Sequence, residues 1–383
     1  MTGRLRTASS APVRQSSVRA HNLALVLQTV ANSADRPSRA AIAAATGLTR
    51  ATVSALVDDL IAGRLLAELD PAPRTGAGRP AAGLALTPDG PAGLGLEINV
   101  DYLAACVVDL TGAVRHRLVA RADQRPLGAA RALADLGALA AQARSAATAD
   151  GLALAGATLA VPGLVGADGL VRVAPNLGWQ DVDAPALLRR EPALAGLPIA
   201  VDNEANLAAL GELRAEGGDP TFLYVSGEIG IGAGLVLDGE LYRGGRGWSG
   251  EIGHLTVYPD GRPCRCGSSG CLEQYAGQEA MAADPDAAAA ALGIALSAAV
   301  NLLDLGVIVL GGGYAPVFHR LRDGIEAELR RRVLTAGLAP VTLRPAVLGA
   351  DAAMRGAADT VLQGVRDDPA AWLGRVAENR IRR

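Results

Sequence analysis

The stretch GHLTVYPDGRPCRCGSSGCLEQ, residues 253–274, places three of the chain's four cysteines within eight positions, shortly after a histidine. One imidazole and three thiolates are the tetrahedral ligand set that Zn²⁺ accepts in closed structural sites. Three glycines among them allow the tight turns that bring such close ligands to one ion. The pattern therefore predicts a structural zinc site formed by His254, Cys264, Cys266 and Cys271. Reduced thiols beside an unrelated histidine are the alternative, and the few basic residues nearby argue against a nucleic-acid-binding zinc module.

The composition indicates a large, alanine-rich α/β protein. The chain has 383 residues, a net charge of −3, 50% hydrophobic residues and only 3% aromatic ones. This length suggests two or three domains, whose cores must be built from Ala, Leu, Val and Ile.

The sequence gives no sign of a targeting or membrane segment. The first seventeen residues lack the continuous apolar run that a signal peptide needs. The apolar stretch 287–309 contains Asn301, Asp304 and two glycines, so it fits a buried helix leading into a strand better than a membrane span. We therefore expect a cytoplasmic protein with no membrane partner, in which clustered cysteines bind metal rather than form disulfides.

Two short helices follow one another closely near the N-terminus. Ser38 is the expected N-cap of the first helix and Gly47 its end, while Thr49 caps the second helix and Gly63 ends it. The second helix should bury one face formed by Val53, Leu56, Val57 and Leu60. Two helices joined by a short turn that contains glycine predict a helix-turn-helix.

The same region is the candidate DNA-binding part of the chain. Residues 1–80 hold ten arginines and five acidic residues, whereas the remainder holds 26 and 34. The segment that follows the second helix is expected to form two short strands around a hairpin, the wing of a winged helix. The predicted DNA contacts lie at the start of the second helix and in the wing: Thr49, Arg50, Thr52, Ser54 and Arg79. A helical bundle used only for dimerisation is the alternative.

Beyond Gly90 the sequence alternates apolar strands with Ala- and Leu-rich helical segments. Stretches such as LAACVVDLTG, GATLAVPGLVG and VIVLGGG are typical of strands that end in glycine turns. This alternation indicates α/β architecture.

Together with the cysteine cluster, these stretches resemble the ROK family of repressors, open reading frames and sugar kinases, and in particular regulators of the xylose-repressor or N-acetylglucosamine-repressor type. The stretch GEIGHLTVYPDGRPCRCGSSGCLEQYAG looks like the family signature and its zinc site together. The resemblance implies two ribonuclease-H-like lobes, as in actin and hexokinase, that close over a sugar. It implies further that a member with an N-terminal winged helix is a transcription factor.

The resemblance also implies a sugar pocket. The family's pocket is formed by an asparagine in a PN loop, an asparagine–acid pair, the Glu and His of GEIGH, and a Glu after the last cysteine. The matching residues here are Asn176, Asn203, Glu204, Glu251, His254 and Glu273. Fixed amide and carboxylate groups suit sugar hydroxyls, which both donate and accept hydrogen bonds. His254 would bind zinc through one ring nitrogen and a sugar hydroxyl through the other. Carboxylates at Glu251 and Glu273 that only hold loop amides are the alternative.

The sequence departs from the family's kinases at the positions that serve phosphate transfer. Glu204 stands where those kinases have an Asp as general base. The first phosphate loop, usually similar to DxGGT, reads Glu97, Ile98, Asn99, Val100 and Asp101 here, and the second carries Glu228. Side chains in place of glycines would crowd a triphosphate, and added carboxylates would repel it. We therefore expect no kinase activity and no bound nucleotide, although a glycine turn at 310–313 is retained.

These observations predict a sugar-responsive transcriptional regulator, most simply a repressor that a monosaccharide releases from a palindromic double-stranded DNA operator. A homodimer or homotetramer would match such an operator. An active sugar kinase that also binds DNA is one alternative, and an activator or DNA-binding protein with a vestigial pocket is another.

The expected domain limits follow from these assignments. They are an N-terminal arm over 1–17, a winged helix-turn-helix over 18–88, a first lobe over 89–203 and a second lobe over 204–359 that contains the zinc loop 254–271. The C-terminal helix over 360–383 is expected to pack on the first lobe.

Overall fold

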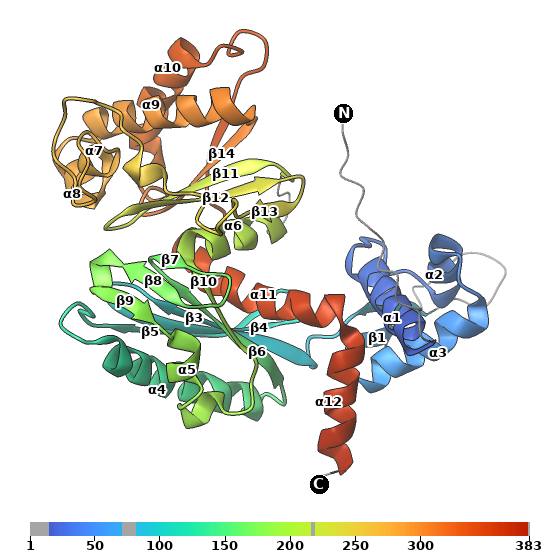
Figure 1. Cartoon of the computed structure of the whole chain (residues 1–383). Helices are drawn as coiled ribbons and strands as arrows, with labels where there is room; N and C mark the ends of the chain where they lie inside the picture. The colour runs from blue at the N-terminus through green and yellow to red at the C-terminus, as the bar shows by residue number, and fades with distance from the viewer. Residues whose placement is uncertain (1–14, 71–81, 216–218, 382–383) are drawn as a thin grey trace. The chain divides into compact units, whose positions relative to one another are not determined.

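The computed structural model describes residues 15–70, 82–215 and 219–381 (Figure 1). The chain forms two compact units. One comprises Met1–Pro91 together with Gln363–Arg383, and the other comprises Ala92–Leu362. We call them the N-terminal unit and the two-lobed unit, and describe each by itself.

The N-terminal unit contains three helices near the start of the chain, α1 (Gln15–Ala31), α2 (Arg39–Thr46) and α3 (Arg50–Ala62). The Ser38 hydroxyl caps α2 by accepting from the Ala41 N–H, and Gly47 ends α2 in the left-handed conformation. Thr49 then caps α3. The axes of α2 and α3 differ in direction by 118°. The predicted apolar face of α3 is buried, as expected for Val53, Leu56, Val57 and Leu60.

A two-stranded antiparallel sheet follows α3. Strand β1 (Leu66–Leu69) pairs with β2 (Gly83–Leu86), with Leu66 opposite Leu86. The connection between the two strands, including Arg79, lies mostly outside the described residues.

The C-terminal end of the chain differs from our expectation of one helix packed on the first lobe. It forms two helices, α11 (Ala352–Asp367) and α12 (Pro369–Ile381), and α12 belongs to the N-terminal unit. Pro369 cannot continue α11, because its ring removes the backbone N–H donor and clashes with the preceding turn. The buried Trp372 then packs α12 against α3, and its indole N–H donates to the Gly63 carbonyl at 3.0 Å.

The first lobe of the two-lobed unit is built on a five-stranded sheet with the order β10-β6-β3-β4-β5. A small three-stranded sheet, in the order β7-β8-β9, is inserted between β6 and β10. The bounds are β3 (Pro91–Ile98), β4 (Tyr102–Asp109), β5 (Val114–Arg121), α4 (Ala129–Ala149), β6 (Ala153–Val161), β7 (Leu164–Val165), β8 (Val171–Ala174), β9 (Trp179–Val182), α5 (Ala184–Leu188) and β10 (Ile199–Asn203). Helix α6 (Glu204–Arg214) follows β10 and packs mainly against β12 and β11 of the second lobe.

The second lobe repeats this plan with a five-stranded sheet in the order β13-β12-β11-β14-β15. In both sheets the first strand is central, the next two follow on one side and the last two on the other. The bounds are β11 (Phe222–Gly227), β12 (Ile231–Leu237), β13 (Glu240–Tyr242), α7 (Glu273–Ala276), α8 (Gln278–Ala283), α9 (Pro285–Leu303), β14 (Val307–Gly312), α10 (Phe318–Arg332) and β15 (Thr342–Pro345).

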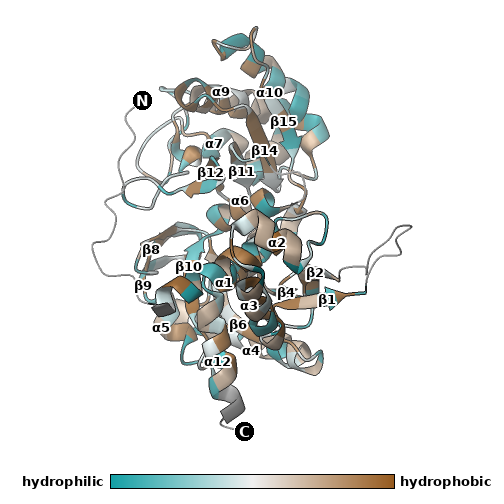
Figure 2. Cartoon of the chain, turned by 90° about the vertical axis from the view of Figure 1, so that its right-hand side faces the viewer, coloured by the Kyte–Doolittle hydropathy of each residue, from teal (hydrophilic) through white to brown (hydrophobic). Residues whose placement is uncertain are grey.

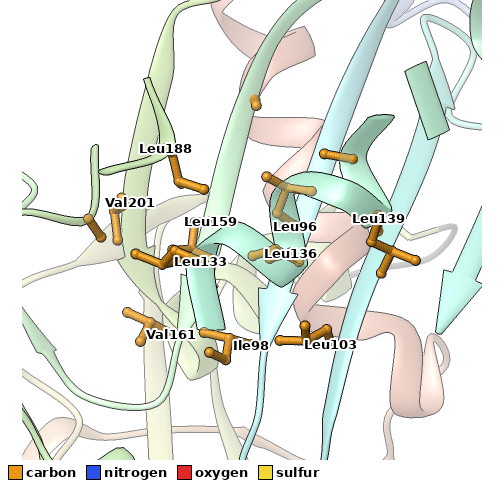
Figure 3. Packing of buried hydrophobic residues seen from close by; sticks show 14 of the residues in the cluster. Leu96, Ile98, Leu103, Leu133, Leu136, Leu139, Leu159, Val161, Leu188 and Val201 are labelled. Carbon is orange, nitrogen blue, oxygen red and sulfur yellow. The ribbon is translucent and has the colours of Figure 1, made fainter. Parts of the chain in front are cut away.

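Each lobe has its own core. In the first lobe, leucines of α4 such as Leu133 and Leu136 pack on Leu96 and Ile98 of β3 (Figure 3). In the second lobe, α9 and α10 pack on each other and contribute to one buried cluster with β11 and β14. The strand β14 is mostly hydrophobic in Figure 2. Helix α9 is long and apolar enough to cross a membrane, but half of its most apolar window is buried, as in the core helix of a globular lobe.

Helix α11 lies very close to β3 and α6 because glycines remove the side chains between them. A Cβ atom at Gly95 of β3 would lie 1.9 Å from the Met354 carbonyl oxygen. A Cβ atom at Gly356 of α11 would lie 1.8 Å from the Leu207 carbonyl oxygen of α6. These distances are shorter than any allowed contact, so backbone meets backbone at both points.

Two glycines in α11 provide a matched test of this packing. Gly356→Ala should lower the free energy of unfolding by about 1–3 kcal/mol, because the added methyl group must push α6 and α11 apart. Gly364→Ala should raise it by about 0.5–1 kcal/mol, because the exposed methyl group meets no described atom within 4 Å and alanine favours the helix. Urea unfolding of both variants measures the difference. Equal effects of the two substitutions would contradict the close packing of α11.

Candidate functional site

The four predicted metal ligands converge in the second lobe. The ligand atoms of His254, Cys264, Cys266 and Cys271 all lie within 4.8 Å of one another. The Cys266 and Cys271 sulfurs are 3.7 Å apart, and the Cys264 sulfur is 3.9 Å from His254 Nδ1. Zinc–sulfur bonds of about 2.3 Å in a tetrahedron put the sulfurs about 3.8 Å apart, so the cluster has the size that such an ion requires. The cluster could therefore hold a metal ion.

The loop reaches this shape through turns that glycine permits. Gly267 and Gly270 have φ values of +92° and +72°, which favour glycine. A Cβ atom at Gly270 would lie 1.7 Å from the Tyr258 carbonyl oxygen. Two backbone hydrogen bonds within the loop close it. The Cys264 N–H donates to the Ser268 carbonyl, and the Gly270 N–H donates to the Arg262 carbonyl.

His254 presents its two ring nitrogens to different surroundings. Nδ1 faces the cysteine sulfurs, which leaves Nε2 for another partner. Glu251 is three residues before it, and Glu273 begins α7 just after the last cysteine. Partial burial raises the pKa of the Glu251 carboxyl, the His254 charge lowers it, and the Glu273 charge raises it again. Glu251 therefore interacts electrostatically both with His254 of the cluster and with Glu273.

Asn176, from the first lobe, meets Glu273, from the second lobe, at Gly230. A Cβ atom at Gly230 would lie 2.9 Å from Glu273 Oε2 and 3.4 Å from Asn176 Nδ2. Asn176 lies in a short 3₁₀ helix between β8 and β9. Polar groups from both lobes therefore approach the same point between the two sheets, and we call this region the cleft.

Asn203 is fixed by backbone contacts at the start of α6. Its side-chain oxygen accepts from the Ala205 and Asn206 N–H groups, and its Nδ2 donates to the Gly163 carbonyl at 3.0 Å. Most of the hydrogen-bonding capacity of this amide is used for capping, so one N–H is left for a ligand. The next residue, Glu204, starts the helix.

Three carboxylates, those of Glu97, Glu204 and Glu228, interact electrostatically. Glu97 is buried and accepts a 2.5 Å hydrogen bond from the Tyr102 hydroxyl. Burial raises its pKa to about 7, partly opposed by Tyr102 and reinforced by the Glu228 charge. Burial and the charges of Glu97 and Glu228 raise the pKa of Glu204 to about 8. The mutual influence of the three groups means that negative charge in this part of the cleft is already unfavourable.

One of these carboxylates, that of Glu228, lies beside the glycine turn at 310–313. Glu228 Oε1 lies 3.2 Å from where a Cβ atom of Gly312 would be. Gly312 has a φ value of +52° and is the last residue of β14. Burial raises the pKa of Glu228, and the Asp101 charge raises it further. The turn keeps its backbone shape, but a carboxylate lies beside it.

The predicted DNA contacts differ in solvent exposure. Arg50 and Thr49 are exposed at the start of α3, whereas Thr52 and Ser54 are half-buried. The Thr49 hydroxyl accepts from the Thr52 N–H and lies 2.8 Å from the Thr52 hydroxyl. Thr49 therefore serves first as a helix cap. Arg79 lies outside the described residues.

Sequence reasoning missed several residues of these sites. Arg243 in the second lobe forms a 2.6 Å ion pair with Asp202, directly before Asn203. Gln274 approaches the Cys264 sulfur at 3.7 Å. Exposed Ala51 and Ala55 accompany Arg50 on the outer face of α3. The ion pair joins residues 41 positions apart, so no local pattern could have indicated it.

Two lobes with the same strand order, polar groups from both lobes in one cleft, and a His/Cys cluster beside it define a class of two-lobed α/β proteins. Residues 93–289 match the ROK family, which is more than half of the chain. The chain belongs to the ROK family.

Individual relatives are regulators and kinases. The xylose repressor of Caldicellulosiruptor bescii is 33% identical over 267 residues, which cover 68% of this chain and 64% of the relative. Alignments with the xylose repressors cover 62 to 64% of their lengths.

Solved structures extend the fold similarity. A ROK family transcriptional regulator described as a homolog of the Escherichia coli MLC protein covers 92% of this chain and 97% of its own, at 24% identity and a TM-score of 0.73. The ROK family glucokinase of Streptomyces griseus, in complex with glucose and AMPPNP, covers 71% of this chain and all of its own, at 26% identity and a TM-score of 0.62. The first similarity shows the fold alone.

The His/Cys cluster predicts a metal content that depends on its thiolates. Cys264→Ser and Cys271→Ser should each lower the bound metal from about one ion per chain to near zero, because a hydroxyl is a poor ligand in a thiolate site. Cys106→Ala is the control, since Cys106 is buried in β4 away from the cluster. Elemental analysis of dialysed protein measures the content. Full metal content in both serine variants would contradict the assignment.

The raised pKa values of the cleft carboxylates predict a dependence of stability on pH. A carboxyl group whose pKa is raised on folding binds protons more tightly in the folded state, so its contribution is full below about pH 4.5 and is lost as pH rises towards 8. Glu204→Gln should therefore be more stable than the parent protein at pH 8.5, by on the order of 2 kcal/mol, and the difference should shrink near pH 5.

Thermal unfolding at both pH values measures this difference. Glu240→Gln, which changes an exposed glutamate on β13, should leave the pH dependence as in the parent. A Glu204→Gln variant with an unchanged pH profile would show that Glu204 is ionised in the folded protein without cost.

Proposed function

We propose that the protein is a sugar-responsive transcriptional repressor, whose binding to a DNA operator is relieved by a monosaccharide bound between the lobes. One observation carries this proposal: the chain combines a capped three-helix unit with a sugar-kinase-like core that has Glu97 and Glu228 at the phosphate-loop positions and Glu204 at the general-base position. The xylose repressors among its relatives support the same function.

The angle and spacing of α2 and α3 support a winged helix-turn-helix in the N-terminal unit. Helices α2 and α3 are joined by three residues at 118°, within the usual range for this motif. The start of α3 would enter the major groove, with Arg50 reaching base edges or phosphates. Exposed Ala51 and Ala55 leave room for close approach and for contact with thymine methyl groups. Thr49, Thr52, Ser54 and Arg79 complete the proposed contacts.

The sugar would bind where the polar groups of both lobes meet. Asn176 and Glu273 converge at Gly230, and Glu251 and His254 lie on the adjoining wall. Asn203 offers its remaining amide N–H, and Glu204 follows it at the start of α6. Directed amides and carboxylates of this kind discriminate between sugars by leaving buried groups unpaired when a hydroxyl points the wrong way.

Zinc is the ion that best fits the His/Cys cluster, because three thiolates and one imidazole match its preference. It would hold the loop that carries His254 and fix this side chain's orientation. Coordination through Nδ1 requires the proton to be on Nε2, which then donates a hydrogen bond to the sugar. The role of the ion is structural, and the binding of the sugar is done by the chain's own side chains.

A sugar kinase is the second candidate, favoured by the retained turn at Gly312 and by the glucokinases among the relatives. The glucokinase of Halalkalibacterium halodurans is 42% identical over 127 residues. The carboxylates of Glu97, Glu204 and Glu228 argue against kinase activity, because a triphosphate would add negative charge where their pKa values are already raised. ATP turnover with glucose or xylose would establish this candidate.

Sugar binding can release DNA only if the sugar prefers one of two conformations of the protein. A sugar that bound both conformations equally would shift nothing, however tightly it bound. We propose that lobe closure is the change, and that it alters the spacing of two helix-turn-helix units in a homodimer or homotetramer. Such an oligomer requires a palindromic operator.

Selection of genomic DNA fragments by the purified protein, with and without a panel of aldoses that includes xylose and glucose, tests this function. We expect one palindromic sequence to be enriched and one sugar to abolish the enrichment. Enrichment that no sugar changes would favour a regulator with a vestigial pocket. Failure to enrich any sequence would overturn the proposal.

Arg50→Ala tests which helix reads the operator. The variant should bind the selected operator at least about tenfold more weakly, because it loses one base or phosphate contact. Its affinity for the sugar, measured by calorimetry, should stay as in the parent. Arg131→Ala, which removes the same charge from an exposed position of α4, should leave operator binding intact.

A further inference from the structure

The loop that leaves β13 joins the second lobe to the first by an ion pair. Arg243 follows β13, an edge strand of the second-lobe sheet, and its guanidinium lies 2.6 Å from the Asp202 carboxylate. Asp202 lies in β10, an edge strand of the first-lobe sheet. The Asp202 side chain is 13% exposed and that of Arg243 is 47% exposed. Water and salt therefore screen this pair less than a pair of fully exposed groups.

The two oxygens of the Asp202 carboxylate have different partners. Oδ1 accepts from the Asn203 N–H at 2.8 Å and from Asn206 Nδ2 at 3.4 Å, both at the start of α6. Oδ2 accepts from Arg243. One carboxylate thus holds the segment that carries Asn203 and, through its other oxygen, a loop of the second lobe.

Arg243 is closely connected to the proposed sugar contact Glu251. The Ser249 N–H donates to the Arg243 carbonyl at 3.2 Å, which closes the loop between them. Gly250 then lies against β12, because the Ala233 N–H donates to its carbonyl, and a Cβ atom at Gly250 would lie 1.9 Å from the Ala233 carbonyl oxygen. Little freedom remains between Arg243 and Glu251, so a change in the position of this loop should move Glu251.

The same loop approaches the first lobe at a second point. A Cβ atom at Gly247 would lie 4.0 Å from the carbonyl oxygen of Val165 in β7. Gly247 has a φ value of +87°, which favours glycine. The loop therefore lies near the first lobe both at Val165 and at Asp202, and Glu251 follows it.

The ion pair thus joins two segments that carry proposed sugar contacts. Asn203 follows Asp202 directly, and Glu251 follows the loop that begins at Arg243. We propose that Asp202 and Arg243 are positioning residues, which hold these two segments at the separation that sugar binding requires. Neither residue is among the proposed sugar contacts. The inference rests on the proposed function, because it requires a sugar to bind between the lobes.

Two substitutions remove the ion pair and leave every proposed sugar contact in place. Asp202→Asn keeps an oxygen that can accept from the Asn203 N–H, but it removes the charge that attracts Arg243. Arg243→Gln removes the opposite charge. A sugar that contacts both segments binds more weakly when they are no longer held, because binding must then order them.

Calorimetric titration of the full-length protein with xylose and with glucose measures the effect. Asp202→Asn and Arg243→Gln should each raise the dissociation constant of the aldose that the parent binds at least about fivefold. The double variant should bind no more weakly than the weaker single variant, because both changes remove one interaction. Arg243→Lys keeps the charge and should retain more of the affinity than Arg243→Gln.

Salt distinguishes the ion pair from a contact that acts only through packing. The parent's affinity for a neutral aldose should fall between about 0.05 M and about 1 M sodium chloride, because ions screen the partly exposed pair. The affinity of Arg243→Gln should change less. Arg246→Gln is the matched control, since Arg246 is an exposed arginine of the same loop with no ion pair among the described residues. This control should bind the aldose as the parent does.

Amide hydrogen exchange without sugar tests the positioning directly. Exchange over 202–206 and 243–254 should be at least about fivefold faster in Asp202→Asn and Arg243→Gln than in the parent and in Arg246→Gln, because the segments open more readily. Unchanged exchange in both variants, or additive losses of aldose affinity in the double variant, would overturn the proposal. A parent that binds no aldose would instead overturn the proposed function, and the exchange rates would still decide whether the ion pair holds the two segments.

Discussion

The buried carboxylate of Glu212 anchors α6, the helix that connects the last strand of the first lobe to the second lobe, to the segment that follows β15. It accepts hydrogen bonds from the Val347 and Leu348 N–H groups at 3.1 and 2.7 Å, and it pairs with Arg344 at 3.3 Å. Loss of these partners would leave a buried charge uncompensated, at a cost of about 3–5 kcal/mol. Helix α6 is therefore tied to the segment that follows β15. Because Asn203 caps the other end of the same helix, Glu212 also helps to hold the helix on which Asn203 and Glu204 lie.

Absent side chains are as important for this fold as present ones. Gly95 and Gly356 let the backbone of α11 contact the backbones of β3 and α6, which fixes the position of α11. Gly230 lets Asn176 and Glu273 approach one point from different lobes. Gly270 lets the metal loop fold back on Tyr258. In each case a methyl group would separate elements that must touch, so a chain with few aromatic residues obtains close packing by removing atoms rather than by filling space.

The parts of the molecule that the sequence predicted are those whose partners lie close in the chain. The caps at Ser38 and Thr49 and the buried face of α3 follow from local spacing and were confirmed. The metal ligands also converge as expected, because all four lie within one loop. By contrast, the ion pair of Asp202 with Arg243 and the packing of Trp372 against Gly63 join distant segments. No periodicity records such pairs, so the position of α12 was predicted wrongly.

The acidic groups of the cleft have a consequence for how a sugar would bind. Glu97 and Glu204 have pKa values of about 7 and 8, so near neutral pH part of the population holds them protonated. Hydroxyl groups that donate to a carboxylate favour its ionised form and lower its pKa. If a sugar hydroxyl donates to Glu204, binding must release protons, and by linkage the sugar must bind more tightly as pH rises through this range. A phosphorylated sugar would have the opposite effect, because its charge raises the same pKa values. The proposed sugar ligand would therefore be a neutral sugar, because the carboxylates of Glu97, Glu204 and Glu228 disfavour added negative charge.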